Sequence, residues 1–149
     1  MSLAGIGRGV RYVLCLMGIV GIVLAAGCES SSHGGTGDAA LAGTKWRLAA
    51  WSVSSLDPSR FTITADFGES RVSGTSAVNT YGGPYTTTAD RHFSVGDIYA
   101  TEMAGSEDAM RAEALYFDLL RQARRHVVTP TTLTLMNDGH QEILIFHSR

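Results

Sequence analysis

Apolar and polar residues alternate along much of the chain between residues 41 and 149, and this period of two predicts β-strands. The alternation is clearest over 61–67, where every second side chain shares one face: Phe61, Ile63, Ala65 and Phe67. Six further segments have strand-like patterns: 45–48, 71–75, 85–89, 91–95, 132–136 and 143–146. Turn signals such as Asn137-Asp138-Gly139 separate them. We therefore expect about seven or eight strands in one antiparallel, strongly curved sheet.

Segment 107–125 has the spacing of an amphipathic helix instead. We expect its apolar face to contain Met110, Ala114, Phe117 and Leu120, beside Tyr116, Leu119 and Ala123. Ser106 is suited to cap this helix, and the acidic residues Glu107 and Asp108 fall in its first turn. The pattern therefore predicts a single α+β domain over residues 41–149, with the sheet packed around one α-helix.

The first 27 residues are typical of a secretory signal peptide. Arg8 and Arg11 precede an uncharged, largely apolar run over 12–26, which is shorter than the ~20 residues that a membrane-spanning helix needs. The small residues Ala26 and Gly27 come directly before Cys28, and this stretch resembles a bacterial lipoprotein lipobox. We expect cleavage after Gly27 and lipidation of Cys28. A plain secretory signal and an uncleaved signal anchor remain as alternatives.

Residues 28–40 are polar and glycine-rich, without an apolar period, so we expect a flexible tether behind the lipidated cysteine. A lipid on Cys28 places the protein at the cell membrane, on its extracytoplasmic face. Cys15 would leave with the signal and Cys28 would carry the lipid, so the mature chain would have no thiol pair. Its stability would then come from the core of one compact domain.

The charge and composition of the chain limit the classes of partner that it is expected to bind. The 149 residues include 12 basic and 14 acidic side chains, for a net charge of −2 without a basic run, which argues against binding to nucleic acid. The five histidines have no metal-ligand spacing, and nothing in the chain indicates a cofactor. We expect a monomer that holds neither metal nor cofactor.

Catalytic chemistry has only one candidate in this sequence, a group of carboxylates before and at the start of the expected helix: Asp97, Glu102, Glu107 and Asp108. Paired carboxylates at a suitable separation serve in glycoside hydrolysis. Acidic residues also gather at helix starts for purely structural reasons. We therefore expect no enzyme, and an envelope hydrolase that uses this group is the least favoured alternative.

Four segments in order resemble the META domain family, also described as heat-shock HslJ-like. Residues 41–48 resemble its opening Leu-x-Gly-x-x-Trp-x-Leu, and residues 72–74 with 79–85 look like its central glycine–asparagine–tyrosine motif. Residues 98–103 are similar to its Thr-x-Met segment, and the closing strands also fit. The resemblance implies the same curved-sheet fold and an envelope or stress-related role.

The central motif allows two interpretations, a shaped connection between strands or a binding surface. Its residues are Gly74, Asn79, Tyr81, Gly82, Gly83 and Tyr85. Many family members carry cysteines where this chain has Val78 and Gly105, so the resemblance implies that a family disulfide, or its equivalent, is absent here. No redox or metal role of those cysteines can be transferred.

Two functions are favoured over the hydrolase for this domain. The first is a lipid-anchored, non-enzymatic binding or adaptor module for an envelope protein, in envelope maintenance or stress response. The alternative is a carrier or sensor that holds a lipid or other apolar ligand between the helix and the sheet, against Met110 and Phe117.

Overall fold

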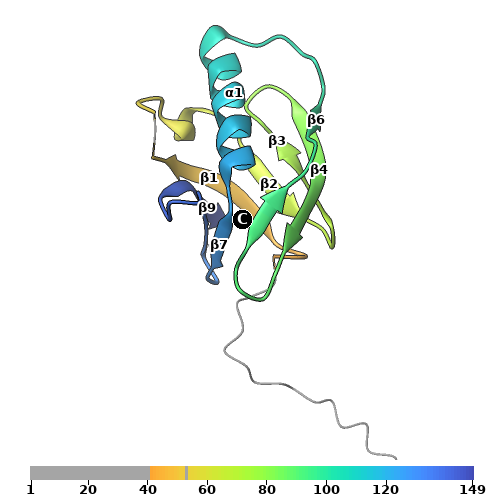
Figure 1. The fold of residues 1–149 in the computed structure, drawn as a ribbon. Coiled ribbons are helices and arrows are strands. Elements are labelled where there is room, and N and C mark those ends of the chain that lie inside the picture. The colour runs from red at the N-terminus through yellow and green to blue at the C-terminus, as the bar shows by residue number, and fades with distance from the viewer. Residues whose placement is uncertain (1–40, 53) are drawn as a thin grey trace, which may run out of the picture. The chain divides into compact units, whose positions relative to one another are not determined.

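Figure 1 shows the computed structural model of the chain, which describes residues 41–52 and 54–149. The predictions for residues 1–40, namely the signal peptide, the lipidated Cys28 and the tether, lie outside the described residues. In the described part a single sheet contains β1 (Lys45–Trp51), β2 (Thr64–Phe67), β3 (Arg71–Thr75), β4 (Thr80–Thr87), β5 (Phe93–Val95), β6 (Tyr99–Ala100), β7 (Arg125–Val128), β8 (Thr132–Met136) and β9 (Glu142–Ser148). The helices are η1 (Pro58–Arg60), a 3₁₀ turn, and α1 (Glu107–Gln122).

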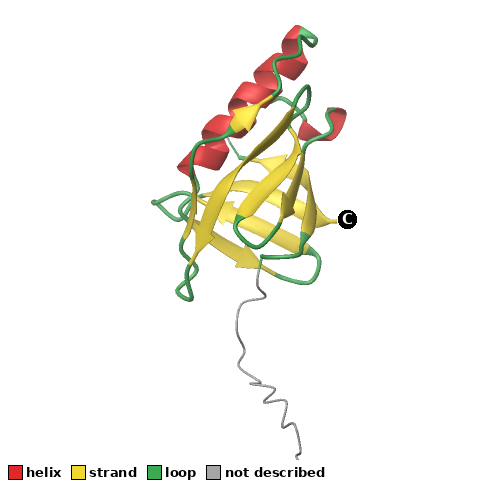
Figure 2. Cartoon of the chain, turned by 90° about the vertical axis from the view of Figure 1, so that its right-hand side faces the viewer, coloured by secondary structure: helices red, strands yellow, loops and turns green. Residues whose placement is uncertain are grey.

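The sheet curls until its two ends meet. Its strand order is β5-β4-β3-β2-β1-β9-β8-β7, every pairing is antiparallel, and the short β6 pairs with β4 off this path. The Phe93 N–H donates to the carbonyl of Arg124 at 2.8 Å, and the His126 N–H donates to the carbonyl of Arg91 at 3.0 Å. These bonds link β5 to β7 and nearly close a barrel, which Figure 2 shows from the side. The predicted antiparallel, strongly curved sheet is confirmed.

The helix differs from its prediction at its end. α1 stops at Gln122, and Arg125 already belongs to β7. The physical reason is the sheet: the N–H of Arg124 donates to the carbonyl of Met136 at 2.7 Å, which draws the chain into the barrel. The start agrees with the sequence, because the Ser106 hydroxyl accepts a hydrogen bond from the Ala109 N–H at 3.3 Å.

The buried face of α1 is also rotated from the predicted one. It contains Ala112, Glu113, Tyr116, Leu119 and Leu120, whereas Ala114 is exposed and Met110 is 41% exposed. The rotation follows from where the helix packs: α1 contacts β5 and β9, and it lies in front of the sheet in Figure 1. The carboxylate of Glu113 therefore lies on the buried face, whereas Met110 and Ala114 of the predicted apolar face lie at the surface.

Aromatic residues fill much of the barrel interior. Trp46 and Trp51 are buried, and each indole N–H has an acceptor, the hydroxyl of Thr44 for the first and the carbonyl of Leu56 for the second, both at 2.7 Å. Ile63, Ala65 and Phe67 are buried as the alternation predicted. No helix within the described residues is long and apolar enough to cross a bilayer.

Candidate functional site

The central motif extends from the half-buried Gly74 in β3 through the β3–β4 connection into β4, and its other members are buried. Asn79 and Tyr81 are each 3% exposed and Tyr85 is 6% exposed, while Gly82 and Gly83 are also buried. These side chains present almost no surface to a partner. The structure therefore favours the first interpretation, a shaped connection between strands.

Two glycines of the motif allow close approaches. A Cβ atom at Gly74 would collide with the backbone carbonyl of Thr64 on the neighbouring β2. A Cβ atom at Gly82 would collide with the phenol of Tyr99, which lies over β4. A side chain at position 74 would push β2 and β3 apart, whereas one at position 82 would displace the Tyr99 phenol.

A buried carboxylate organises the β3–β4 connection. The Oε2 atom of Glu113 accepts hydrogen bonds from the Ser76 hydroxyl at 2.6 Å and from the Asn79 backbone N–H at 2.9 Å. Its Oε1 atom accepts a bond from Asn79 Nδ2 at 2.8 Å. We call Ser76, Asn79 and Glu113 the Glu113 hub. It fastens α1 to a connection that lies far earlier in the chain, because Ser76 precedes Glu113 by 37 positions and Asn79 precedes it by 34.

The same asparagine fixes the segment that leads into α1. Its Oδ1 atom accepts bonds from the Thr101 hydroxyl at 2.7 Å and from the Met103 backbone N–H at 2.8 Å. Nδ2 also donates to the Met103 carbonyl at 3.3 Å. One buried amide therefore joins the helix, the β3–β4 connection and the surface segment 101–103.

A pair of buried phenols lies next to the hub along β4 and α1. The hydroxyls of Tyr81 and Tyr116 are 2.6 Å apart, and Tyr81 donates to the Thr64 carbonyl at 3.0 Å. Burial raises the pKa of both phenols above the ordinary value near 10, because the phenolate loses its hydration. Both side chains therefore remain neutral and serve as a hydrogen-bonded part of the core.

Glu113 was not predicted as a special residue, although the sequence holds one signal for it. It stands three positions before Tyr116 and seven before Leu120, so all three share one helix face. A charged residue on the face centred on Tyr116 is the unusual feature. Finding it required the correct rotation of the helix, which the apolar pattern did not supply.

A surface groove lies directly over the hub. It has a volume of about 350 Å³ and is lined by residues 101–104 together with Asn79, Met110 and Glu113. Met103 is 62% exposed and Met110 is 41% exposed, so two thioether side chains stand at its rim. We call this feature the methionine groove. Its floor is the hub, and its wall is the segment that Asn79 fixes.

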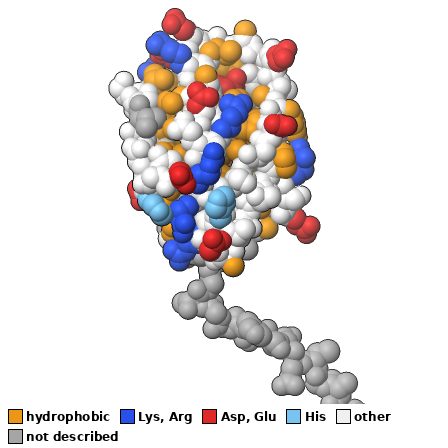
Figure 3. Space-filling view, viewed as in Figure 1, with side chains coloured by type: hydrophobic (Ala, Val, Ile, Leu, Met, Phe, Trp, Pro, Cys, Tyr) orange, Lys and Arg blue, Asp and Glu red, His pale blue; other side chains and the backbone are white. Residues whose placement is uncertain are grey.

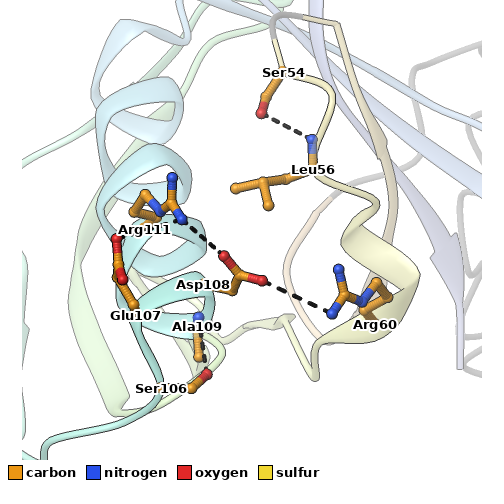
Figure 4. Close-up of polar contacts among 8 residues, drawn as sticks. All are labelled: Ser54, Leu56, Arg60, Ser106, Glu107, Asp108, Ala109 and Arg111. Atoms are coloured by element: carbon orange, nitrogen blue, oxygen red, sulfur yellow. Dashed lines mark hydrogen bonds and ion pairs between the residues drawn. The ribbon is translucent and has the colours of Figure 1, made fainter.

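The acidic group predicted as a possible catalytic site divides into two parts. Glu107 and Asp108 lie in the first turn of α1, beside a groove of about 760 Å³, and Figure 4 shows Asp108 between Arg60 and Arg111. The Arg111 guanidinium is 2.9 Å from Asp108 and 3.5 Å from Glu107, and Arg60 is 3.8 Å from Asp108. These carboxylates therefore act in ion pairs at a helix start.

Asp97 and Glu102 are exposed and lie on the segment between β5 and α1. Within the described residues, no group of three or more His, Cys, Asp or Glu side chains is arranged to hold a metal ion. This placement gives no specific support to a hydrolase that would use the four carboxylates together.

The face of α1 that was expected to hold an apolar ligand is only partly turned toward the sheet. Tyr116 and Leu120 are fully buried, and Phe117 is partly buried against the rings of Tyr81 and Tyr116. Met110, the other predicted ligand contact, lies at the surface. The two predicted ligand contacts, Met110 and Phe117, therefore do not share one buried face.

The structure brings Val78 and Gly105 together. A Cβ atom at position 105 would lie 3.5 Å from the Cβ of Val78 and 2.6 Å from its Cγ2. The first distance matches the roughly 3.5–4.5 Å between Cβ atoms of a disulfide. The two positions therefore have the proximity that a cysteine pair requires, and the branched Val78 side chain fills the space that Gly105 leaves.

Comparisons with known proteins agree with this fold. The model of the META domain family matches residues 39–149. An NMR structure of a protein from Burkholderia xenovorans is 25% identical, with a TM-score of 0.61, over 73% of this chain and 83% of that chain. A crystal structure of a DUF4847 family protein from Bacteroides vulgatus has a TM-score of 0.55 at 12% identity, over 72% of this chain and 93% of that chain, and shows the fold alone. Among curated proteins, none matches. Neither the family's description nor the names of these structures states a catalytic activity.

Proposed function

This chain belongs to the META domain family, and from that premise we propose that it is a lipid-anchored, extracytoplasmic binding or adaptor module without catalytic activity. We assign it to maintenance of the cell envelope or to its stress response, with an envelope protein as its partner. The observation that carries the proposal is the link from the buried Asn79 amide to the exposed Met103.

That link is a means of holding a binding surface in one shape. Asn79 makes three hydrogen bonds to Thr101 and Met103, and its backbone N–H and Nδ2 also donate to Glu113. The Met103 side chain nevertheless points outward and is 62% exposed. A surface that is already ordered loses less conformational entropy when a partner binds. Rigid backbone under exposed apolar side chains therefore favours a binding role.

The anchor in this proposal comes from the sequence. Cys28 follows a signal-like segment and stands shortly before Leu41, the buried residue at which the described domain begins. A single acyl chain gives only reversible membrane binding, so stable anchoring needs the several chains that lipoprotein processing would attach to Cys28. The domain would then work close to the membrane surface.

Substitution of Cys28 tests the anchor. We expect Cys28→Ala to move the protein out of the membrane fraction, and we expect mass spectrometry of the native N-terminal peptide to show an acylated Cys28. An unmodified Cys28 in the membrane-bound protein would contradict this part of the proposal.

Site-specific photocrosslinking in the native host tests the binding role. A photoreactive residue at position 103 should give a reproducible protein adduct, whereas the same residue at Asp138, in the exposed β8–β9 turn, should not. Equal labelling from both positions, or only the adducts of an unrelated lipoprotein, would refute a specific partner.

A further inference from the structure

We infer that the methionine groove receives an arginine side chain of the partner polypeptide, with its apolar stem against Met103 and Met110 and its guanidinium against Glu102 and Glu113. This inference rests on the proposed function, because it names the site and the partner chemistry of that binding role. It follows from the charge, the size and the polarity of the groove.

All the charged residues that line the groove are acidic. Two carboxylates, those of Glu102 and Glu113, line it, and none of its lining residues, all within the described part of the chain, is basic. The groove beside the start of α1 is different, because there Arg60 and Arg111 neutralise Asp108. Over the face of the molecule that Figure 3 shows, acidic and basic side chains are interspersed. A cation is therefore the complementary occupant.

The hub leaves an acceptor for that cation. Within the described residues Oε1 of Glu113 accepts one hydrogen bond, from Asn79, while Oε2 accepts two. A carboxylate offers about four lone-pair sites over its two oxygens, so Oε1 can accept a further donor. Glu113 is only 8% exposed, so water screens it less than it screens a surface carboxylate.

The rim of the groove favours an occupant whose cationic group is carried on an apolar stem. Thioethers adapt their shape to apolar groups, and Met103 and Met110 present two of them above the carboxylates. Arginine combines a stem of methylene groups with a weakly hydrated, planar cation that binds carboxylates well at interfaces. A volume of about 350 Å³ lies at the lower end of the usual range for ligand sites, which fits a side chain better than a larger molecule.

The methionines provide the measurement. Residues 41–149 contain three of them, Met103 and Met110 at the groove and Met136 on β8 away from it. We would label the methionine methyl groups with ¹³C in the mature chain, held in phosphatidylcholine nanodiscs, and titrate the blocked peptide Gly-Leu-Arg-Leu-Gly. The control peptide carries citrulline, the neutral isostere of arginine.

We expect the arginine peptide to shift the Met103 and Met110 signals at about millimolar concentration, as suits a short ligand, and to leave Met136 unchanged. Citrulline should weaken binding by about tenfold, because it removes the charge. Glu102→Gln should weaken the arginine peptide by roughly threefold and reduce the salt dependence of binding. Asp118→Asn, which removes the same charge outside the groove, should have no effect.

Three results would overturn the inference: no shift at any methionine, equal shifts at all three, or equal affinity for the citrulline peptide. The outcome is separable from the anchor. If Cys28 proves unmodified while the Met103 and Met110 signals still shift, arginine binding in the groove is supported and the lipid anchor is refuted. If Cys28 is acylated and a partner is crosslinked at position 103 but the peptide fails, the binding role stands and arginine recognition falls.

Discussion

At one end of β4 the rings of Phe67, Tyr85 and Phe93 pack against one another, whereas at the other end Ser76 and Asn79 surround the carboxylate of Glu113. The first group, the aromatic cluster, has ring centroids 5.0 to 6.3 Å apart and no charged member. The Glu113 hub joins three segments through directed hydrogen bonds. Both groups are buried, yet they hold the same strand by different forces.

This difference indicates that the aromatic cluster mainly stabilises the fold, whereas the Glu113 hub mainly positions the segments that it joins. Burial of apolar surface stabilises the core strongly but is not directional, so the aromatic cluster stabilises the packing of β2, β4 and β5 more than it positions any one group. Hydrogen bonds to a buried carboxylate depend on geometry and fail together when one partner is lost. The hub is therefore suited to hold segment 101–103 and the methionine groove in one arrangement. The binding surface that we propose lies at the hub end.

The largest effect should come from the aromatic cluster. We expect Phe93→Ala to lower the free energy of unfolding by about 3–5 kcal/mol, because it removes a fully buried ring and leaves a cavity. Urea denaturation would measure this loss. Tyr99→Ala, which truncates an aromatic side chain that is 62% exposed, should cost about 1 kcal/mol or less. Similar losses in the two variants would break the assignment of the cluster as the main apolar anchor.

A covalent link should strengthen the hub end. The double substitution Val78→Cys and Gly105→Cys should form a disulfide and raise the free energy of unfolding by about 3 kcal/mol, a typical gain for a loop of this size. Denaturation with and without reductant would measure the gain, and each single substitution serves as the control. Two free thiols after oxidation would show that the segments are farther apart than the 3.5 Å between Cβ positions indicates.

A smaller loss of stability, with a more local effect on structure, should follow substitution within the hub. Glu113→Gln places an amide NH₂ where donors of Ser76 or Asn79 need an acceptor, so we expect a loss of about 1–3 kcal/mol. Hydrogen exchange should increase over residues 76–80 and 101–106 and remain unchanged over 85–95.

Asp118→Asn is the matched control for that substitution, because Asp118 is an exposed residue of the same helix, paired with Arg121 at 3.5 Å. Its loss should stay below about 0.5 kcal/mol. If Glu113→Gln increased exchange equally at both ends of β4, the two regions would form a single cooperative unit and the comparison would fail.

Much of the fold could be predicted from the chain. The alternation over 61–67 places Ile63, Ala65 and Phe67 inside, as observed, and the turn at 137–140 separates β8 from β9. The end of α1 could not be predicted in this way, because helical spacing continues to Arg125 while the barrel draws that residue into β7. The two-residue β6 also has too little pattern to be recognised, since it depends on its pairing with β4.

The candidate site shows the same division. The asparagine and glycines of the central motif were recognised from the chain, and their role as a shaped connection was one of the two interpretations offered. Glu113 was missed because hydropathy assigns a glutamate to the outer face of a helix, and only its three donors explain why it lies inside. The exposure of Met103 and Met110 was likewise hidden by their apolar character.

Periodicity predicted the helix and most of the strands, because burial of one strand face imposes a period of two whatever the strand packs against. It missed the first half of β4, which runs from Thr80 to Thr87 and not over 85–89, because Gly82, Gly83 and Pro84 interrupt the pattern there. Tertiary structure decided the rotation of α1, the meeting of β5 with β7, and the placement of Glu113 under Met103. Those features depend on contacts between residues far apart in the chain, and a local pattern of apolar and polar residues does not specify such contacts.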